Sequence, residues 1–227
     1  MTAASLPAPR NVAALILGAG SGARMGNLAK AFLETGGTTL LRRAVELVRP
    51  YCGEILAGVR AGDVERGSAT VADLGAKVTA GGATRQETLA ILLSRATKDF
   101  VVVHDVARPF AAARLFETVL AAAGESGAAS VFLPASRADA IGLAEGEEMI
   151  APLPRENVVF TQTPQAYRRD WLLDAYRQAE AQGWEEQSTT GLVTRAGYRI
   201  RLVPGDSENI KITYSEDWES ARARLPL

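Results

Sequence analysis

Short runs of aliphatic residues alternate along the chain with segments whose apolar positions recur at the three- and four-residue spacing of a helix. Uninterrupted apolar runs are typical of buried strands, and the helical spacing is typical of amphipathic helices. The runs predict strands at 11–17, 54–59, 76–80, 99–105, 128–135, 198–203 and 209–213. The spacing predicts helices at 38–48, 83–96, 113–127, 168–183 and 215–225, the last with Ser215 as its N-cap. Because strands and helices alternate, we expect an α/β fold with a mostly parallel, twisted sheet flanked by helices.

The regular pattern is interrupted once, in the second half of the chain. Before the interruption, the valine run at 99–105 favours a strand at the centre of the sheet. From Ser136 to about Gln162 the chain is polar and holds only two weak strand-like pieces, accompanied by Pro152 and Pro154. Such a stretch is too long for a tight connection. We therefore expect one domain over 1–227 with a protruding arm or functional loop at about 136–162.

The composition limits the classes of protein to which the chain can belong. Its 227 residues are 47% hydrophobic, and its net charge is −1, so neither a nucleic-acid nor a membrane partner is expected. Cys52 is the only cysteine and His104 the only histidine, which excludes an intramolecular disulfide, a thiolate metal cluster and a histidine-based metal site. No apolar run is long enough for a membrane span, and the first ten residues lack a signal-peptide core, so the cytoplasm is the expected location.

A glycine-rich turn, GAGSGARMG at 18–26, follows the first predicted strand. Gly18, Gly20 and Ala23 match the looser dinucleotide fingerprint G-x-G-x-x-A. However, Gly26 interrupts the helix that this fingerprint requires, and the next strand ends without the acid that binds ribose. The phosphate-loop pattern G-x-x-x-x-G-K-[ST] is absent as well. The turn therefore fits a phosphate site better than a resting dinucleotide.

Two cations, Arg24 near the end of this turn and Lys30 just beyond it, could converge on one point. A bound dinucleotide needs only backbone N–H groups and a helix end. Nucleotidyl transfer needs fixed cations as well, because negative charge develops on the equatorial oxygens and on the departing pyrophosphate. Solvated loop charges are the alternative for such a pair. Their position after a buried strand and a glycine-rich turn favours catalysis.

Other predicted strands also end in polar residues, and ligands bind beyond the carboxyl ends of strands in open α/β sheets. The cations at these ends are Arg24, Lys30, Arg85, Arg108 and Lys211. Such a group suits a nucleoside triphosphate together with a second phosphorylated substrate. No covalent nucleophile is evident, so we expect direct in-line attack with Mg²⁺ on the triphosphate, which Asp105 could reach through water. His104 is expected to be a buried strand-end residue rather than a base.

Taken together, these motifs resemble the 2-C-methyl-D-erythritol 4-phosphate cytidylyltransferase family of the non-mevalonate isoprenoid pathway. The resemblance covers nearly the whole chain and rests on GAGSGARMG with KAFL, and on GGATRQ, VVVHDVARPF, TQTPQAY and ENIKIT, in this order. It implies a Rossmann-like nucleotidyltransferase fold and a homodimer whose arm crosses to the partner subunit. It also implies transfer of CMP from CTP to methylerythritol phosphate, with release of pyrophosphate.

The resemblance further implies roles for individual residues. It places Arg24 and Lys30 at the α-phosphate in the transition state. It implies a CTP site formed by Gly18, Ala19, Gly20, Gly22, Ala23, Gly82, Ala83, Arg85, Thr88 and Lys211. It implies an acceptor site formed by Asp105, Arg108, Arg155, Thr163 and Thr189, with Arg155 crossing the dimer to the 4-phosphate.

The chain departs from the family's pattern at three places. Leu17 and Gly18 stand where proline and alanine are usual, Ala140 follows Asp139 where a threonine is usual, and STTG at 188–191 replaces an acidic motif. The last two departures lie on the acceptor side, where losing a charge-assisted contact costs roughly 1.5–3 kcal/mol. Another polyol phosphate, such as ribitol 5-phosphate, is therefore an alternative acceptor. A non-catalytic nucleotide-binding homologue is a second alternative, which Arg24 and Lys30 disfavour, and an NAD-dependent oxidoreductase comes last.

Overall fold

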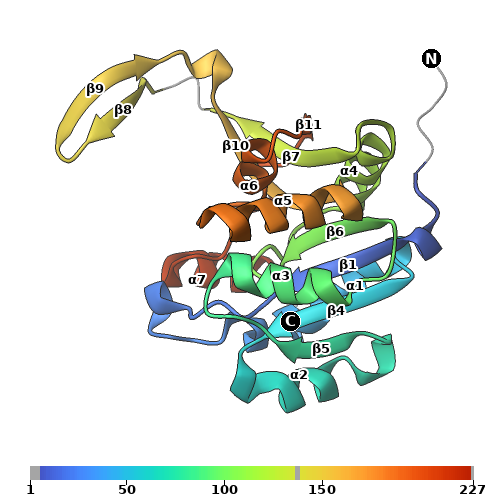
Figure 1. Cartoon of the computed structure of the whole chain (residues 1–227). Coiled ribbons are helices and arrows are strands. Elements are labelled where there is room, and N and C mark those ends of the chain that lie inside the picture. Colours follow the sequence, from blue (N-terminus) through green and yellow to red (C-terminus); the bar gives the residue numbers. More distant parts are fainter. Residues whose placement is uncertain (1–5, 136–138, 226–227) are drawn as a thin grey trace.

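A twisted sheet runs through the computed structural model, which describes residues 6–135 and 139–225 (Figure 1). Seven strands of the described chain are hydrogen-bonded in the order β11-β7-β10-β6-β1-β4-β5. They are β1 (Val12–Leu17), β4 (Glu54–Val59), β5 (Lys77–Ala80), β6 (Phe100–Asp105), β7 (Ala128–Pro134), β10 (Val159–Arg168) and β11 (Arg201–Pro204). Only β10 runs antiparallel to its neighbours β6 and β7. The mostly parallel sheet expected from the sequence is confirmed.

Strand β6 lies at the middle of this sheet, between β1 and β10. Its three consecutive valines are fully buried, as their unbroken run predicts. The parallel register places Leu17, the last residue of β1, opposite both Asp105 and Gly58. The carboxyl ends of β1, β4 and β6 therefore meet at one edge of the sheet, and the loops that follow them share that edge.

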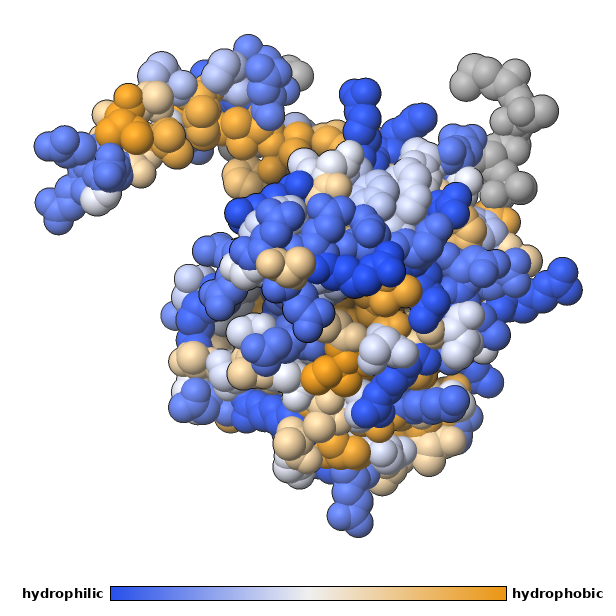
Figure 2. Space-filling view, in the orientation of Figure 1, coloured by the Kyte–Doolittle hydropathy of each residue, from blue (hydrophilic) through white to orange (hydrophobic). Residues whose placement is uncertain are grey.

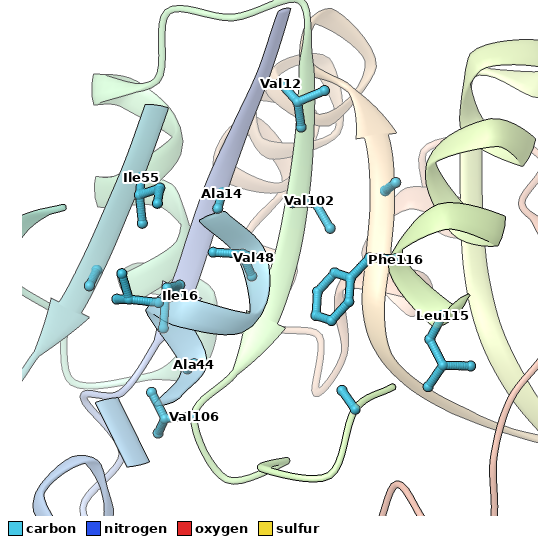
Figure 3. Close-up of a cluster of buried hydrophobic side chains, with 14 of the residues drawn as sticks. Val12, Ala14, Ile16, Ala44, Val48, Ile55, Val102, Val106, Leu115 and Phe116 are labelled. Atoms are coloured by element: carbon cyan, nitrogen blue, oxygen red, sulfur yellow. The ribbon is translucent and has the colours of Figure 1, made fainter. Parts of the chain in front are cut away.

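Helices cover both faces of the sheet, because successive strand residues point to opposite faces. The α-helices are α1 (Leu40–Val48), α2 (Val64–Thr70), α3 (Arg85–Arg95), α4 (Ala113–Ser126), α5 (Arg169–Gln182), α6 (Thr189–Arg195) and α7 (Ser215–Arg224). Val12, Ala14 and Ile16 of β1 pack toward α1 and α4, as Figure 3 shows. Ala13 and Leu15 pack on the other face against α3, α5 and α6. Two apolar layers thus hold the central strands rigid.

Strand β10 was not predicted, and the segment before Gln162 was assigned to the arm. The strand is polar and contains Pro164, which breaks the apolar pattern of a central strand. A register shift against β7 between Thr161 and Gln165 accommodates the proline. The buried amide of Gln165 accepts a hydrogen bond from the Tyr167 hydroxyl and donates to the Gln162 carbonyl. Side-chain partners, rather than apolar character, therefore allow this strand to be buried.

The strand predicted at 209–213 is wrong, because this segment pairs with no strand of the described chain. Its apolar alternation has another cause: Ile212 is fully buried, and its backbone N–H donates to the Ala107 carbonyl at 2.8 Å. Two boundaries also differ. Strand β11 begins at Arg201 rather than 198, and α7 already includes Ser215, so that Tyr214 precedes the helix. The short helices α2 and α6 were not predicted.

A separate hairpin, β8 (Ile141–Glu145) with β9 (Glu148–Leu153), projects from the body of the molecule (Figure 1). It carries exposed apolar side chains at Leu143, Met149, Ile150 and Leu153, and Figure 2 shows apolar surface running along it. An isolated two-stranded hairpin is marginally stable in water. Residues 136–138, where the predicted arm begins, and residues 1–5 of the N-terminal segment lie outside the described part. No helix within the described ranges is both long and apolar enough to cross a bilayer.

Candidate active site

A cleft of about 280 Å³ opens at the edge of the sheet where β1, β5 and β6 end. Its walls are the glycine-rich turn after β1, the first turn of α3, the tip of β6 and Lys211. Every residue predicted to contact CTP lines this cleft, as do Arg24, Lys30 and Asp105. The lining also includes residues that were not predicted to contact a ligand, namely Leu17, Ser21, Thr84, Val106 and Ala107. The structure thus gathers at one place residues that lie far apart in the sequence.

Two glycines of the turn, Gly18 and Gly22, are closely packed against neighbouring backbone. The Gly18 N–H donates to the Gly58 carbonyl at 2.8 Å, and a Cβ at Gly18 would lie 3.1 Å from that oxygen. Gly22 has a positive φ of 66°, and a Cβ there would lie 2.1 Å from the Leu28 carbonyl. Six consecutive residues, 18–23, therefore bring backbone to the cleft wall without bulky side chains. A wall of this kind suits a phosphate chain.

A small apolar cluster positions the cations around the turn. Met25, Ala107 and Ile212 are buried together with Leu40 and with Ala221 of α7. Arg24 precedes Met25 in the sequence, and Lys211 precedes Ile212. Anchoring the two apolar side chains therefore fixes the two cations beside the cleft, although Arg24 lies on a single 3₁₀ turn and Lys211 in irregular chain.

Lys30 is held by backbone oxygens of the same C-terminal segment. Its ammonium donates to the Ile212 carbonyl at 2.9 Å and to the Thr213 carbonyl at 3.2 Å. Burial lowers the pKa of Lys30, and the charges of Arg24 and Lys211 lower it further. The Arg24 guanidinium lies over the ring of Tyr214, 5.6 Å from its centroid. Three cations from separate segments therefore share one electrostatic environment.

Asp105 balances part of this positive charge at the tip of β6. Its carboxylate accepts from Arg85 at 3.2 Å and from Lys211 at 2.7 Å. Burial opposes ionisation of this carboxyl, but the nearby Arg85 and Lys211 outweigh burial and hold its pKa well below the usual range. Asp105 therefore remains charged at neutral pH and fixes both cations in the cleft.

The predicted acceptor residues are only partly brought together. Thr189 accepts from the Arg85 guanidinium at 2.6 Å, and the Thr163 hydroxyl accepts from the Asp105 N–H at 3.1 Å. Both threonines are 3% exposed and lie behind the cleft lining. Arg108 donates instead to the Asn209 carbonyl at 2.6 Å. Arg155 lies in a 3₁₀ turn, 155–157, that follows β9, and it is not part of the lining.

The turn before α3 is fixed by the first residues of that helix. The Gly82 N–H donates to the Thr88 hydroxyl at 3.1 Å, and the Ala83 N–H donates to the Glu87 carboxylate at 2.7 Å. A Cβ at Gly82 would lie 2.4 Å from the Cβ of Glu87, so glycine is required. Because both N–H groups are engaged within the chain, carbonyl oxygens are the groups that this turn can offer to a ligand.

Sequence reasoning missed three residues that support the cleft. The buried side chains of Gln162 and Asn209 tie the segment that carries Lys211 to β10: Asn209 donates to the Thr163 carbonyl at 2.9 Å, and Gln162 donates to the Asp206 carbonyl at 3.1 Å. Both lie within the motifs TQTPQAY and ENIKIT, but neither side chain was given a role because β10 itself was not predicted. Arg60, which binds the glycine-rich turn, follows β4 directly. Its position at a strand end was a usable signal.

The described residues contain no group of three or more histidine, cysteine, aspartate or glutamate side chains arranged to hold a metal ion. Asp105 is the acidic side chain of the cleft lining, and both of its oxygens already accept hydrogen bonds from cations. A carboxylate oxygen can accept more than one hydrogen bond. A water-mediated contact from Asp105 to an ion carried by a nucleotide is therefore compatible with this geometry.

The chain resembles known proteins along nearly its whole length. The profile of the 2-C-methyl-D-erythritol 4-phosphate cytidylyltransferase family matches residues 12–226. The protein of that name from Deinococcus radiodurans is 39% identical over 224 residues, which cover 98% of this chain and 93% of the relative. The protein of that name from Thermus thermophilus is also 39% identical, over 212 residues, which cover 93% of this chain and 96% of the relative.

Solved structures match the fold as well. The crystal structure of 2-C-methyl-D-erythritol 4-phosphate cytidylyltransferase from Thermus thermophilus superposes with a TM-score of 0.79 at 38% identity, covering 93% of this chain and 97% of that chain. That of 4-diphosphocytidyl-2C-methyl-D-erythritol synthase from Anaerococcus prevotii has a TM-score of 0.83 at 23% identity, covering 95% of this chain and 96% of that chain. At 23% identity, the similarity to the Anaerococcus prevotii structure shows a shared fold only.

His104 lies next to Asp105 but is fully buried, as expected. Its ring packs edge-on against Phe116 at a centroid distance of 5.2 Å. Neither ring nitrogen has a hydrogen-bond partner among the described residues. Burial lowers the pKa of His104 from 6.5 to about 4. A neutral imidazole enclosed in this way is a packing residue rather than a general base.

We expect the imidazole signal of His104, observed by NMR, not to titrate between pH 8 and pH 5. In the unfolded chain the His104 imidazole is protonated with a pKa near 6.5, whereas in the folded chain it is protonated only near pH 4. Its contribution to stability is therefore complete above pH 6.5 and declines as the pH falls toward 4. His104→Leu should show a shallower loss of unfolding free energy over this range. A His104 titration midpoint near 6.5 would contradict the assignment.

Proposed function

The chain belongs to the 2-C-methyl-D-erythritol 4-phosphate cytidylyltransferase family, and we infer that it transfers CMP from CTP to 2-C-methyl-D-erythritol 4-phosphate with release of pyrophosphate. Its mostly parallel sheet flanked by helices is the α/β nucleotidyltransferase fold of that family. The reaction belongs to the non-mevalonate isoprenoid pathway. The observation that carries the proposal is the convergence of Arg24, Lys30 and Lys211 on a cleft walled by glycine-rich backbone.

The proposed chemical step is a direct displacement at the α-phosphorus of CTP. An oxygen of the acceptor's 4-phosphate forms a bond to this phosphorus, and the bond to the oxygen that bridges to the β-phosphate breaks. Pyrophosphate leaves with that oxygen. Because charge builds on the equatorial oxygens and on the leaving group, fixed cations lower the barrier. No covalent intermediate with the protein is needed.

Lys30 is suited to this role by its hydrogen bonds. Two of its donors are taken by the Ile212 and Thr213 carbonyls, which fix the position of the ammonium. An ammonium has three donors, so one remains for a phosphate oxygen. Arg24 is exposed and lines the same cleft, with its guanidinium over the ring of Tyr214. We assign both side chains to the α-phosphate and Lys211 to the neighbouring phosphates.

The remaining groups divide between the two substrates. The backbone of 18–23 would cradle the triphosphate, and the carbonyl oxygens of the Gly82–Ala83 turn would accept from the cytosine amino group. Asp105 would face the acceptor, where its carboxylate can accept from the polyol hydroxyls, and Arg85, assigned to the CTP site, is held beside it by their ion pair. Mg²⁺ would enter on the phosphates of CTP, with Asp105 as a contact through water. When bound, the ion neutralises phosphate charge and stabilises the departing pyrophosphate.

The residues on the acceptor side are also compatible with a second acceptor substrate. Thr189 and Thr190 stand where the family's pattern is acidic, and they supply hydroxyls only: Thr189 accepts from Arg85, and the Thr190 hydroxyl lies 3.4 Å from that of Thr161. A hydroxyl can hydrogen-bond but supplies no charge. A different polyol phosphate, such as ribitol 5-phosphate, is therefore the second candidate acceptor.

A pyrophosphate-release assay tests the proposal. Purified protein is incubated with Mg²⁺, each of the four ribonucleoside triphosphates and a panel of polyol phosphates that includes both candidates. We expect release only with CTP, and fastest with methylerythritol phosphate. Faster release with ribitol 5-phosphate would move the assignment to the second candidate. Nucleotide binding without release for any pair would overturn the enzymatic assignment.

We expect Arg24→Ala and Lys30→Ala each to lower kcat by roughly 10²- to 10³-fold while changing the Kd for CTP much less, since both cations act mainly on charge that develops in the transition state. Steady-state kinetics and calorimetric titration with CTP measure the two quantities. Arg49→Ala, at an exposed arginine outside the cleft lining, is the matched control and should behave like the parent. Equal losses in kcat and CTP affinity would assign the two side chains to ground-state binding.

We further propose that the projecting hairpin joins two copies of the chain into a homodimer. Its exposed apolar side chains, Leu143, Met149 and Ile150, form a surface that a second copy would cover. Arg155 follows the hairpin and is not part of the cleft lining in its own chain. In the dimer it would reach the acceptor's 4-phosphate in the partner's cleft.

Arg155→Ala should therefore raise the KM for the acceptor and leave the KM for CTP unchanged. Mixing Arg155→Ala with the inactive Lys30→Ala should restore activity, because one cleft of each mixed dimer then combines an intact Lys30 with an intact Arg155 from its partner. No restoration after subunit exchange, verified by native mass spectrometry, would show that Arg155 acts within its own chain or not at all.

A further inference from the structure

Arg60 binds the segment 20–28, which comprises most of the glycine-rich turn and the two residues after it, from outside the cleft. It follows Val59, the last residue of β4, and it does not line the cleft. Its guanidinium donates to the Asn27 and Leu28 carbonyls, each at 2.9 Å. It also donates to the Gly20 carbonyl at 3.3 and 3.4 Å and to the Ser21 carbonyl. One side chain thus engages four backbone oxygens of a single turn.

These four oxygens belong to both ends of the turn. Gly20 and Ser21 precede the 3₁₀ segment Ala23–Met25, and Asn27 and Leu28 follow it. Arg24 lies on that segment, between the two pairs of carbonyls that Arg60 holds. A fixed fork of N–H donors can join several carbonyls at once, which a single ammonium cannot do with the same geometry. Arg60 therefore acts on Arg24 through the backbone on either side of it.

The turn has few other constraints of its own. Within the turn, Met25 N–H and Asn27 N–H donate to the Gly22 carbonyl, at 2.8 and 3.0 Å. Gly22, Gly26 and Asn27 all have positive φ, and glycines lose more conformational freedom on ordering than other residues. Met25 anchors the turn at one point through the apolar cluster, but the residues on either side of it would still sample several conformations without a further partner. The bonds from Arg60 supply that partner.

The direction of the carbonyls matters for the anion that the turn would hold. Carbonyls bound to Arg60 point toward a side chain that is not part of the cleft lining. Their negative ends are therefore withdrawn from the phosphate site and partly neutralised by the guanidinium. The same charge adds positive potential behind the cleft wall.

We propose that Arg60 is a positioning residue for nucleotidyl transfer, which orders the turn at 20–28 before the nucleotide binds and so aims Arg24 at the α-phosphate. The proposal rests on the proposed function for its kinetic readout only, since order in the turn can be measured without substrate. The part played by Arg60 is indirect, and no contact between Arg60 and a substrate is required.

The test compares Arg60→Ala and Arg60→Lys with Arg42→Ala. Arg42 is the matched control because it also makes several bonds, to the Thr70 carbonyl at 3.1 Å and to Asp73 at 2.7 Å, but does not line the cleft or contact the turn. Amide hydrogen exchange at 20–28 is measured by mass spectrometry on the unliganded full-length chain. Steady-state kinetics with CTP and methylerythritol phosphate, and the melting temperature, complete the comparison.

For Arg60→Ala we expect faster exchange at 20–28, a kcat lowered by roughly ten- to a hundredfold through misplacement of Arg24, and an unchanged KM for the acceptor. Arg60→Lys should lie between Arg60→Ala and the parent. Arg42→Ala should lower the melting temperature without changing exchange at 20–28 or kcat. If Arg60→Ala folds poorly, guanidinium ion can be added to replace the missing side-chain group. Partial recovery of kcat would then support the proposal.

Parent-like exchange at 20–28 in Arg60→Ala would overturn the proposal, whatever the activity. Parent-like kcat in that variant, or an equal fall of kcat in Arg42→Ala, would overturn it as well. A parent protein that transfers no nucleotide would instead refute the proposed function, and the exchange comparison would still decide whether Arg60 orders the turn.

Discussion

The site depends on holding several positive charges close together before any phosphate is present. Arg24, Lys30 and Lys211 come from different segments and repel one another, which is part of why the pKa of Lys30 is lowered. Three features oppose the repulsion: the carbonyls of Ile212 and Thr213 at Lys30, the carboxylate of Asp105 at Lys211, and the apolar cluster around Met25 and Ile212. A triphosphate would relieve the remaining repulsion, and the charge that develops during transfer would relieve it further. A preorganised arrangement of this kind needs no rearrangement at the moment of reaction.

The sheet makes this arrangement possible because its parallel register brings separate loops to one edge. Leu17, Gly58 and Asp105 lie side by side at the ends of β1, β4 and β6. The turn that carries Arg24 therefore starts beside the aspartate that fixes Lys211, and Arg60 leaves the neighbouring strand at the position from which it can reach the turn. The strand ends determine the positions of the site residues, and the buried valines of β6 keep those ends rigid.

Much of this could be anticipated from local patterns. Strands β1, β4 and β6 have largely continuous apolar runs, and the glycine-rich turn and the GGATRQ segment have distinctive sequences, so these strands, β5 and the two segments were found with small errors at the ends. The short helix α2, between β4 and β5, was not found. Strand β10 was not predicted, because its burial depends on polar side chains such as Gln165, whose hydrogen-bond partners are set by the tertiary structure. At 209–213 a strand was predicted where none forms. The apolar alternation there reflects one anchored residue, Ile212, and not hydrogen bonding to a neighbouring strand. Arg60 was overlooked because only acidic residues were sought at the end of β4.

The assignment of Arg24 and Lys30 to the same α-phosphorus atom makes a geometric prediction. A crystal structure of the protein with α,β-methylene-CTP and Mg²⁺ tests it most directly, because this analogue cannot release the pyrophosphate group. We expect oxygens of the α-phosphate to lie within about 3.2 Å of both Lys30 Nζ and a guanidinium nitrogen of Arg24. A bound nucleotide whose α-phosphate is remote from both side chains, with Arg24 and Lys30 directed into bulk water, would contradict it.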